Sequence, residues 1–155
     1  MIGLLKRVAK WMGKKAGDLA NSLAKRRILN EGALPLPIPN PGACALFASR
    51  SFQRRVNNPV VECYQLAEEL YKASGETGGT LQINNGSRPL KIPEKGIVTD
   101  RFDFHVVYTD GEFVFDPRYR DNPIPRAEYE AETRQLNGEE VSITLEKRRP
   151  QDHSS

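Results

Sequence analysis

The pattern of apolar and polar positions near residue 110 consists of two short apolar-rich runs with a polar pair between them. Residues 102–109 and 112–117 are rich in aromatic and β-branched side chains, and Asp110-Gly111 separates them. An Asp-Gly pair between two such runs is a strong β-hairpin signal. If the loop has two residues, the numbers of opposed residues sum to 221, so that His105 faces Asp116. The pattern therefore predicts a histidine beside a carboxylate on one face of a sheet.

A second pattern, with helical spacing, starts at residue 63. Apolar side chains recur there at intervals of three and four and predict one buried helix face, formed by Cys63, Leu66, Ala67, Leu70 and Tyr71. Asn58-Pro59 before this pattern is typical of a helix start, and Ser74-Gly75 after it is typical of a helix end. Cys63 is therefore expected in or near the first turn, pointing inward.

Shorter segments complete the predicted domain. Residues 80–83 and 89–92 are strand candidates with a turn between them, residues 125–136 form a helix that ends at Asn137-Gly138, and residues 141–145 form a last strand. Residues 42–55 are ambiguous, although Ala45, Leu46 and Phe47 are expected in the core. A helix followed by an antiparallel sheet, with one further helix between strands, makes the predicted fold class α+β.

The first forty residues have a different character. Over residues 1–30, apolar side chains recur at helical spacing with lysines and arginines between them, which predicts an amphipathic helix or two. Proline then occupies every second position from Pro35 to Pro41, which predicts an extended, semi-rigid segment. The predicted organisation is a basic amphipathic helical extension at 1–33, a Pro-rich linker at 34–41 and the α+β domain at 42–155.

The charge of the chain is concentrated in this extension. Residues 1–27 hold eight basic side chains and one acidic side chain, a net charge of +7, which leaves −4 for the remainder because the total is +3. A basic amphipathic helix can lie on an anionic membrane, dock onto a partner protein or pack on its own domain, and all three interpretations of residues 1–27 stay open. The net acidic domain argues against nucleic acid as a partner.

Composition excludes several classes of site. Two cysteines, Cys44 and Cys63, are too few for a disulfide framework, and only His105 and His153 accompany them. No metal site and no cofactor are therefore expected. No apolar run reaches the ~18 residues that a membrane span needs. Cys44 lies among small apolar residues and is most simply a buried core thiol.

Cys63, His105 and Asp116 together suggest catalytic chemistry. A thiolate is a strong nucleophile, an imidazole keeps it ionised and later protonates the leaving group, and an acid orients the imidazole. A helix start also favours the thiolate, because unpaired N–H groups point toward it. The structural alternatives are a core cysteine on an apolar helix face and a strand histidine that is bonded to Asp116 only for stability.

Three segments resemble the papain-like fold, in particular the papain-fold toxin domains of bacterial polymorphic toxins and secretion-system effectors. These segments are NPVVECYQLA at 58–67, FDFHVV at 102–107 and GEFVFDP at 111–117, and the later Ile124-Pro125 with Tyr129 is similar as well. The resemblance covers about residues 55–135. It implies Cys63 as nucleophile, His105 as base and Asp116 as orienting acid, with Asn57 as a candidate oxyanion donor in place of the family's glutamine.

The resemblance also implies a function. A papain-like cysteine protease would act through a thioester acyl-enzyme on a protein of the target cell, after secretion or delivery by a secretion system into that cell's cytoplasm. A cognate immunity protein would protect the producing cell. Two alternatives stay open: a glutamine deamidase on the same fold, and a membrane-active or docking protein that acts through its basic N-terminal helix.

Overall fold

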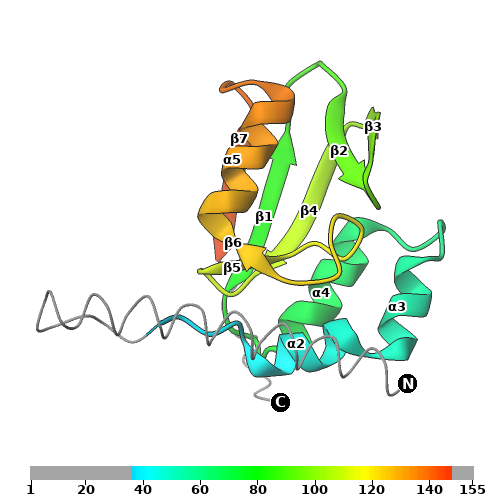
Figure 1. The fold of residues 1–155 in the computed structure, drawn as a ribbon, viewed down its shortest axis with the longest axis vertical. Coiled ribbons are helices and arrows are strands. Elements are labelled where there is room, and N and C mark those ends of the chain that lie inside the picture. The colour runs from blue at the N-terminus through cyan, green and yellow to red at the C-terminus, as the bar shows by residue number, and fades with distance from the viewer. Residues whose placement is uncertain (1–35, 148–155) are drawn as a thin grey trace, which may run out of the picture.

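A computed structural model describes residues 36–147 and shows an α+β fold, as predicted (Figure 1). Its helices are α2 (Pro41–Ala48), α3 (Arg50–Val56), α4 (Cys63–Ala73) and α5 (Arg126–Asn137). The ends predicted for α4 at Ser74-Gly75 and for α5 at Asn137-Gly138 are confirmed. The basic extension predicted at 1–33 lies outside the described residues.

The strands form two antiparallel sheets. The larger sheet has the order β6-β5-β4-β1-β7 and contains β1 (Gly79–Asn84), β4 (Phe104–Thr109), β5 (Phe113–Phe115), β6 (Ile124–Pro125) and β7 (Ser142–Lys147). The smaller sheet pairs β2 (Leu90–Glu94) with β3 (Ile97–Phe102). The strands expected at 80–83 and 89–92 are present, but they belong to different sheets. Strand β3 was not predicted.

Strand β4 lies between two apolar cores. Tyr108 and the β5 residues Phe113 and Phe115 pack with the buried side chains of α2, α3 and α4. Val107 and Val114 point to the opposite core, which contains buried residues of β1, β2 and α5. Figure 1 shows α2, α3 and α4 gathered together and apart from α5. Because side chains alternate along a strand, β4 contributes to both cores and connects them.

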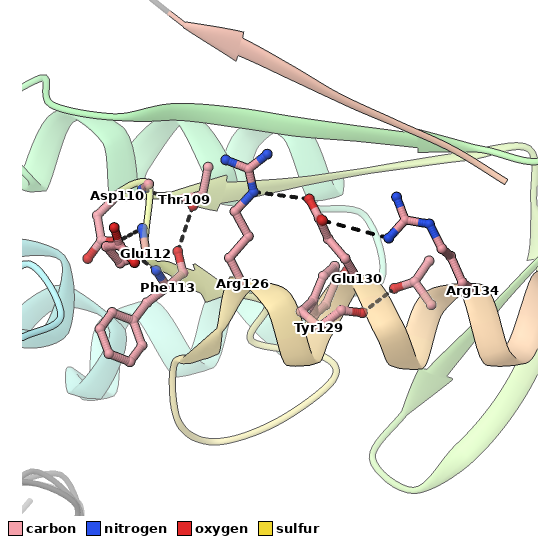
Figure 2. A network of polar contacts seen from close by, with 10 residues as sticks. Thr109, Asp110, Glu112, Phe113, Arg126, Tyr129, Glu130 and Arg134 are labelled. Atoms are coloured by element: carbon pink, nitrogen blue, oxygen red, sulfur yellow. Dashed lines mark hydrogen bonds and ion pairs between the residues drawn. The ribbon is translucent and has the colours of Figure 1, made fainter. Parts of the chain in front are cut away.

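The hairpin between β4 and β5 differs from the predicted one. Its pairs are Tyr108 with Phe115 and Thr109 with Val114, so opposed residues sum to 223 rather than 221, and three residues, 110–112, connect the two strands. The Asp110 side chain closes the loop, because its Oδ1 accepts the backbone N–H groups of Glu112 at 3.0 Å and Phe113 at 2.8 Å (Figure 2). A shift of two positions leaves every side chain on its predicted face.

The start of α4 also differs from the prediction. Asn58-Pro59 does not begin the helix; the Asn58 side chain instead accepts the Val60 N–H at 3.1 Å within the preceding turn. Glu62 is the N-cap, and it forms a capping box with Gln65, whose side chain accepts the Glu62 N–H at 2.9 Å. The helix therefore begins four residues after Pro59. Cys63 becomes its first residue, as expected for the first turn.

The segment before α2 joins the hairpin. Residues 36–40 have no regular secondary structure, and Asn40 then caps α2 by accepting the Ala43 N–H at 3.0 Å. The Asn40 backbone N–H donates to Asp110 Oδ2 at 2.8 Å. The expectation that Ala45 enters the core is wrong, because Ala45 is exposed, whereas Cys44 and Phe47 are buried on the other side of the helix.

We predict that Gly78→Ala destabilises the protein by about 2 kcal/mol or more. Gly78 has a φ of 82°, and a Cβ there would lie 2.2 Å from the Thr109 carbonyl oxygen at the end of β4. Gly86→Ala is the matched control, because Gly86 has a φ of 66° and open space around it, so only the backbone strain of about 1–2 kcal/mol remains. Urea unfolding measures both; equal losses would show that the close approach is unimportant.

Candidate active site

Cys63 is the first residue of α4 and lies at the junction of that helix with β4. Its thiol is partly buried and is free rather than in a disulfide. A small cavity brings Cys63 together with His105 and Asp116 and is completed by residues of α4, β4 and the chain after β5. The structure therefore brings the three predicted residues to one place.

His105 and Asp116 form a buried pair. His105 Nε2 lies 2.8 Å from Asp116 Oδ2, and each residue is only 2% exposed. In the observed register the two residues are diagonal rather than directly opposed, because Thr109 pairs with Val114. Diagonal neighbours on one face are within reach of longer side chains. The predicted contact is therefore present although the predicted register was wrong.

The charge of Asp116 sets the protonation of His105. Burial alone lowers the pKa of His105, but the charge of Asp116 and its hydrogen bond outweigh burial and raise this pKa to about 10. These interactions therefore favour the imidazolium form of His105 at neutral pH. Nε2 is engaged by Asp116, whereas the buried Nδ1 has no hydrogen-bond partner among residues 36–147. Nδ1 is the ring nitrogen that remains for the thiol and for a substrate.

The two thiols of the chain have opposite electrostatics. Burial raises the pKa of Cys63, but the His105 side chain and the Val106 backbone N–H lower it by more, so the net shift is downward. Burial raises the pKa of Cys44 to about 11, and the charge of Asp110 adds to this effect. Cys63 is thus the thiol that favours the thiolate. Cys44 is the buried core thiol that the sequence predicted.

Arg118 connects the acid side of the site to the nucleophile side. It lies two residues after Asp116, and its guanidinium donates to the carbonyl oxygens of Val56, Asn58 and Val61 at 3.3, 3.4 and 2.6 Å. These carbonyls belong to the end of α3 and to the turn that leads into Cys63. This role of Arg118 was not predicted, because nothing in the local sequence around a single arginine after a strand indicates which backbone carbonyls it will contact.

Tyr129 on α5 is a further contact that was missed. Its hydroxyl donates to Asp116 Oδ2 at 2.9 Å, the same oxygen that meets His105. Tyr129 is 4% exposed and belongs to the core on the α5 side of the sheet. The resemblance of Ile124-Pro125 and Tyr129 to the family pattern was the available signal, although it did not indicate a partner for this hydroxyl.

Asn57, the candidate oxyanion donor, lies outside the cavity that Cys63, His105 and Asp116 line. It is exposed at the end of α3, and its side-chain oxygen accepts a hydrogen bond from Lys95 Nζ. The backbone N–H groups of Cys63 and Tyr64 are the alternative donors, because a helix start leaves its first N–H groups without intrahelical acceptors, whereas the Gln65 N–H is engaged by Glu62.

Between residues 36 and 147, no three His, Cys, Asp or Glu side chains gather in a way that could hold a metal ion. Over the same range, no helix has the length and apolar character needed to cross a membrane.

Comparisons with family models, with curated proteins and with solved structures found no match. The α+β class follows from the elements themselves, and the feature of the structure that bears on function is the geometry around Cys63.

We predict that Cys63 reacts with iodoacetamide at pH 6–7 about tenfold or more faster than an ordinary thiol, of which only a few per cent is ionised there. In His105→Gln this advantage is lost, and reactivity rises only as the pH approaches or exceeds the ordinary thiol pKa, because burial then disfavours the thiolate and only the Val106 backbone N–H still offsets it. Alkylation rates are measured in a Cys44→Ala background by mass spectrometry. A profile that His105→Gln leaves unchanged would contradict the pairing of Cys63 with His105.

We predict that Arg118→Lys lowers the free energy of unfolding by about 1–3 kcal/mol, because an ammonium cannot reach three carbonyls as the guanidinium does. Cys63 alkylation at neutral pH also slows, since the turn before the thiol loses its support. Arg88→Lys is the control, because Arg88 contacts Glu140 at 3.6 Å in an exposed pair that contributes little. Comparable effects of both substitutions in urea unfolding would refute the role of Arg118.

Proposed function

We propose that the protein is a thiol-dependent hydrolase of papain-like type that cleaves amide bonds of proteins. The observation that carries this proposal is a thiol at a helix start that shares one cavity with a buried His105–Asp116 pair. The electrostatics of this pair lower the pKa of the thiol. A cysteine or a His–Asp pair alone has an ordinary structural explanation. The combination of all three in one cavity has the arrangement of a nucleophile, an acid–base group and an orienting acid.

The first half of the reaction forms an acyl-enzyme. The Cys63 thiolate attacks the carbonyl carbon of the substrate, and the carbonyl electron pair moves to its oxygen. Backbone N–H groups at the start of α4 are available to stabilise that oxyanion. When the intermediate collapses, the C–N bond breaks and His105 Nδ1 gives its proton to the departing amine. The product is a thioester on Cys63 and a neutral imidazole.

The second half regenerates the enzyme. Neutral His105 takes a proton from water at Nδ1 while the water oxygen attacks the thioester carbonyl. Collapse of the second intermediate breaks the C–S bond and releases a carboxylic acid, which leaves Cys63 as thiolate and His105 as imidazolium. Asp116 stays bonded to Nε2 throughout, so the ring keeps one orientation while its charge changes.

The biological setting of the proposal comes from the resemblance. In that setting the protein is a bacterial toxin or effector, secreted or delivered into a target cell, and an immunity protein protects the producer. Deamidation of a glutamine side chain uses the same acyl-enzyme route with ammonia as the leaving group. Peptide-bond cleavage is the proposed reaction on family grounds. The alternative that places the function in residues 1–27 concerns a segment outside the described residues.

We predict that expression of the wild-type chain in target cells produces new protein termini that are absent with Cys63→Ala, together with a loss of toxicity in that variant. Cys44→Ala is the matched control, because it removes the other thiol, whose pKa is raised, and it should retain full activity. Proteomic mapping of termini and of Gln-to-Glu changes is the measurement. Glu conversions without new termini would make the protein a deamidase, and identical maps for Cys63→Ala and wild type would refute the proposal.

A further inference from the structure

One oxygen of Asp116 accepts two hydrogen bonds while the other accepts none from the described residues. Oδ2 lies 2.8 Å from His105 Nε2 and 2.9 Å from the Tyr129 hydroxyl. Oδ1 is fully buried and has no partner among residues 36–147. A carboxylate held through a single oxygen can turn about its side-chain bond if one of the two donors is lost. The Tyr129 hydroxyl is thus placed where it controls the orientation of Asp116.

The position of this hydroxyl is set by α5 rather than by the strands of the site. The Tyr129 ring packs edge-on against the Tyr119 ring, with 5.6 Å between their centroids. One turn further along the helix, Thr133 Oγ1 donates to the Tyr129 carbonyl at 2.8 Å. Figure 2 shows Glu130, next to Tyr129 in the chain, between Arg126 and Arg134. The phenol therefore approaches Asp116 from a well-anchored helix.

Tyr129 acts as a hydrogen-bond donor over the whole working pH range. Burial raises its pKa well above the ordinary value, and the charge of Asp116 raises it further. A phenol that keeps its proton cannot serve as a base in the reaction. The Tyr129 hydroxyl donates its hydrogen bond to Asp116 and not to the Cys63 thiol. Its chemistry at this site is to stabilise a negative charge by donating a hydrogen bond.

We propose that Tyr129 is a positioning residue of the catalytic site: its hydroxyl holds Asp116 with Oδ2 toward His105 and stabilises the charge of that carboxylate. This inference rests on the proposed function, because it assigns a role within the Cys63, His105 and Asp116 arrangement. The consequence is electrostatic. A well-held Asp116 charge keeps His105 protonated, and protonated His105 keeps Cys63 ionised as the pH falls.

Removal of the hydroxyl should weaken each of these steps. In Tyr129→Phe the ring remains in its packing site, but Oδ2 keeps one donor and the buried charge becomes harder to maintain. The Asp116 carboxylate can then also rotate about its side-chain bond, because Oδ1 accepts no hydrogen bond from the described residues that would hold it in place. Fewer molecules then carry the thiolate and imidazolium pair at low pH. At high pH the thiol ionises without help, so the variant and wild type should converge.

The test is the pH profile of Cys63 alkylation by iodoacetamide in a Cys44→Ala background. For Tyr129→Phe we expect the acid side of the profile to move upward by about one pH unit, which is about a tenfold slower reaction near pH 6. Incorporation of 3-fluorotyrosine at position 129, which makes the phenol a stronger donor, should move the profile the other way. An unshifted profile in both proteins would overturn the proposal.

Two controls separate positioning from general stability. Tyr108→Phe removes another buried hydroxyl, which donates to the Thr77 carbonyl at 3.1 Å, and it should lower stability without moving the profile. In an Asp116→Asn background, Tyr129→Phe should have no further effect on the profile, because the charge it stabilises is gone. Tyr129 would have a structural role only if Tyr108→Phe moved the pH profile as far as Tyr129→Phe does. The same conclusion would follow if Tyr129→Phe moved the profile as far in the Asp116→Asn background as in the wild type.

The outcome is independent of the test of the proposed function. Cys63 alkylation reports the thiolate whether or not the protein cleaves amide bonds. If proteomic maps for Cys63→Ala and wild type are identical while Tyr129→Phe shifts the profile, the hydrolase proposal fails and the positioning role stands. If wild-type Cys63 reacts no faster than glutathione at pH 6–7, the positioning role is refuted, since there is no ion pair for Tyr129 to support.

Discussion

The buried hydrogen bond between His105 and Asp116 is the constraint on which the rest of the structure depends. Both residues are 2% exposed, and a charge withdrawn from water to this extent is tolerated only with a partner. The carboxylate raises the pKa of His105, and the imidazolium in turn lowers that of Cys63. A structural bond between β4 and the segment after β5 thereby also affects the reactivity of a thiol on a neighbouring helix.

Three segments that are distant in sequence must converge for this bond to work. Strand β4 carries His105, Asp116 directly follows β5, and the start of α4 carries Cys63. Arg118 joins the second segment to the turn before the third through three carbonyl oxygens. Tyr129 links α5 to the site as well, because it belongs to the core on the α5 side and its hydroxyl donates to Asp116. The site is therefore located where the two cores meet, and packing on either side of β4 contributes to its geometry.

The contrast between the two cysteines shows how far the surroundings decide chemistry. Cys44 and Cys63 both belong to helices that pack on the same core, yet burial raises the pKa of one to about 11 while His105 lowers that of the other. The proposed nucleophile differs from the core thiol by its place at a helix start and by one imidazolium. Neither feature concerns the cysteine itself, so the identity of a residue alone does not assign its role.

Local patterns were enough to predict the α+β class, a helix from Cys63 to about Ser74, a helix over 125–136, and, with the Asp110-Gly111 turn signal, the shared face of His105 and Asp116. Spacings of two, three and four determine which side chains share a face, and that information is contained in neighbouring residues. The three-residue connection at 110–112, the Glu62 cap and the contacts of Arg118 and Tyr129 were decided by the tertiary structure. Each depends on a side chain that meets backbone or carboxylate groups in the folded chain: Asp110 closes the loop, Gln65 completes the cap, and α5 brings a phenol to Asp116.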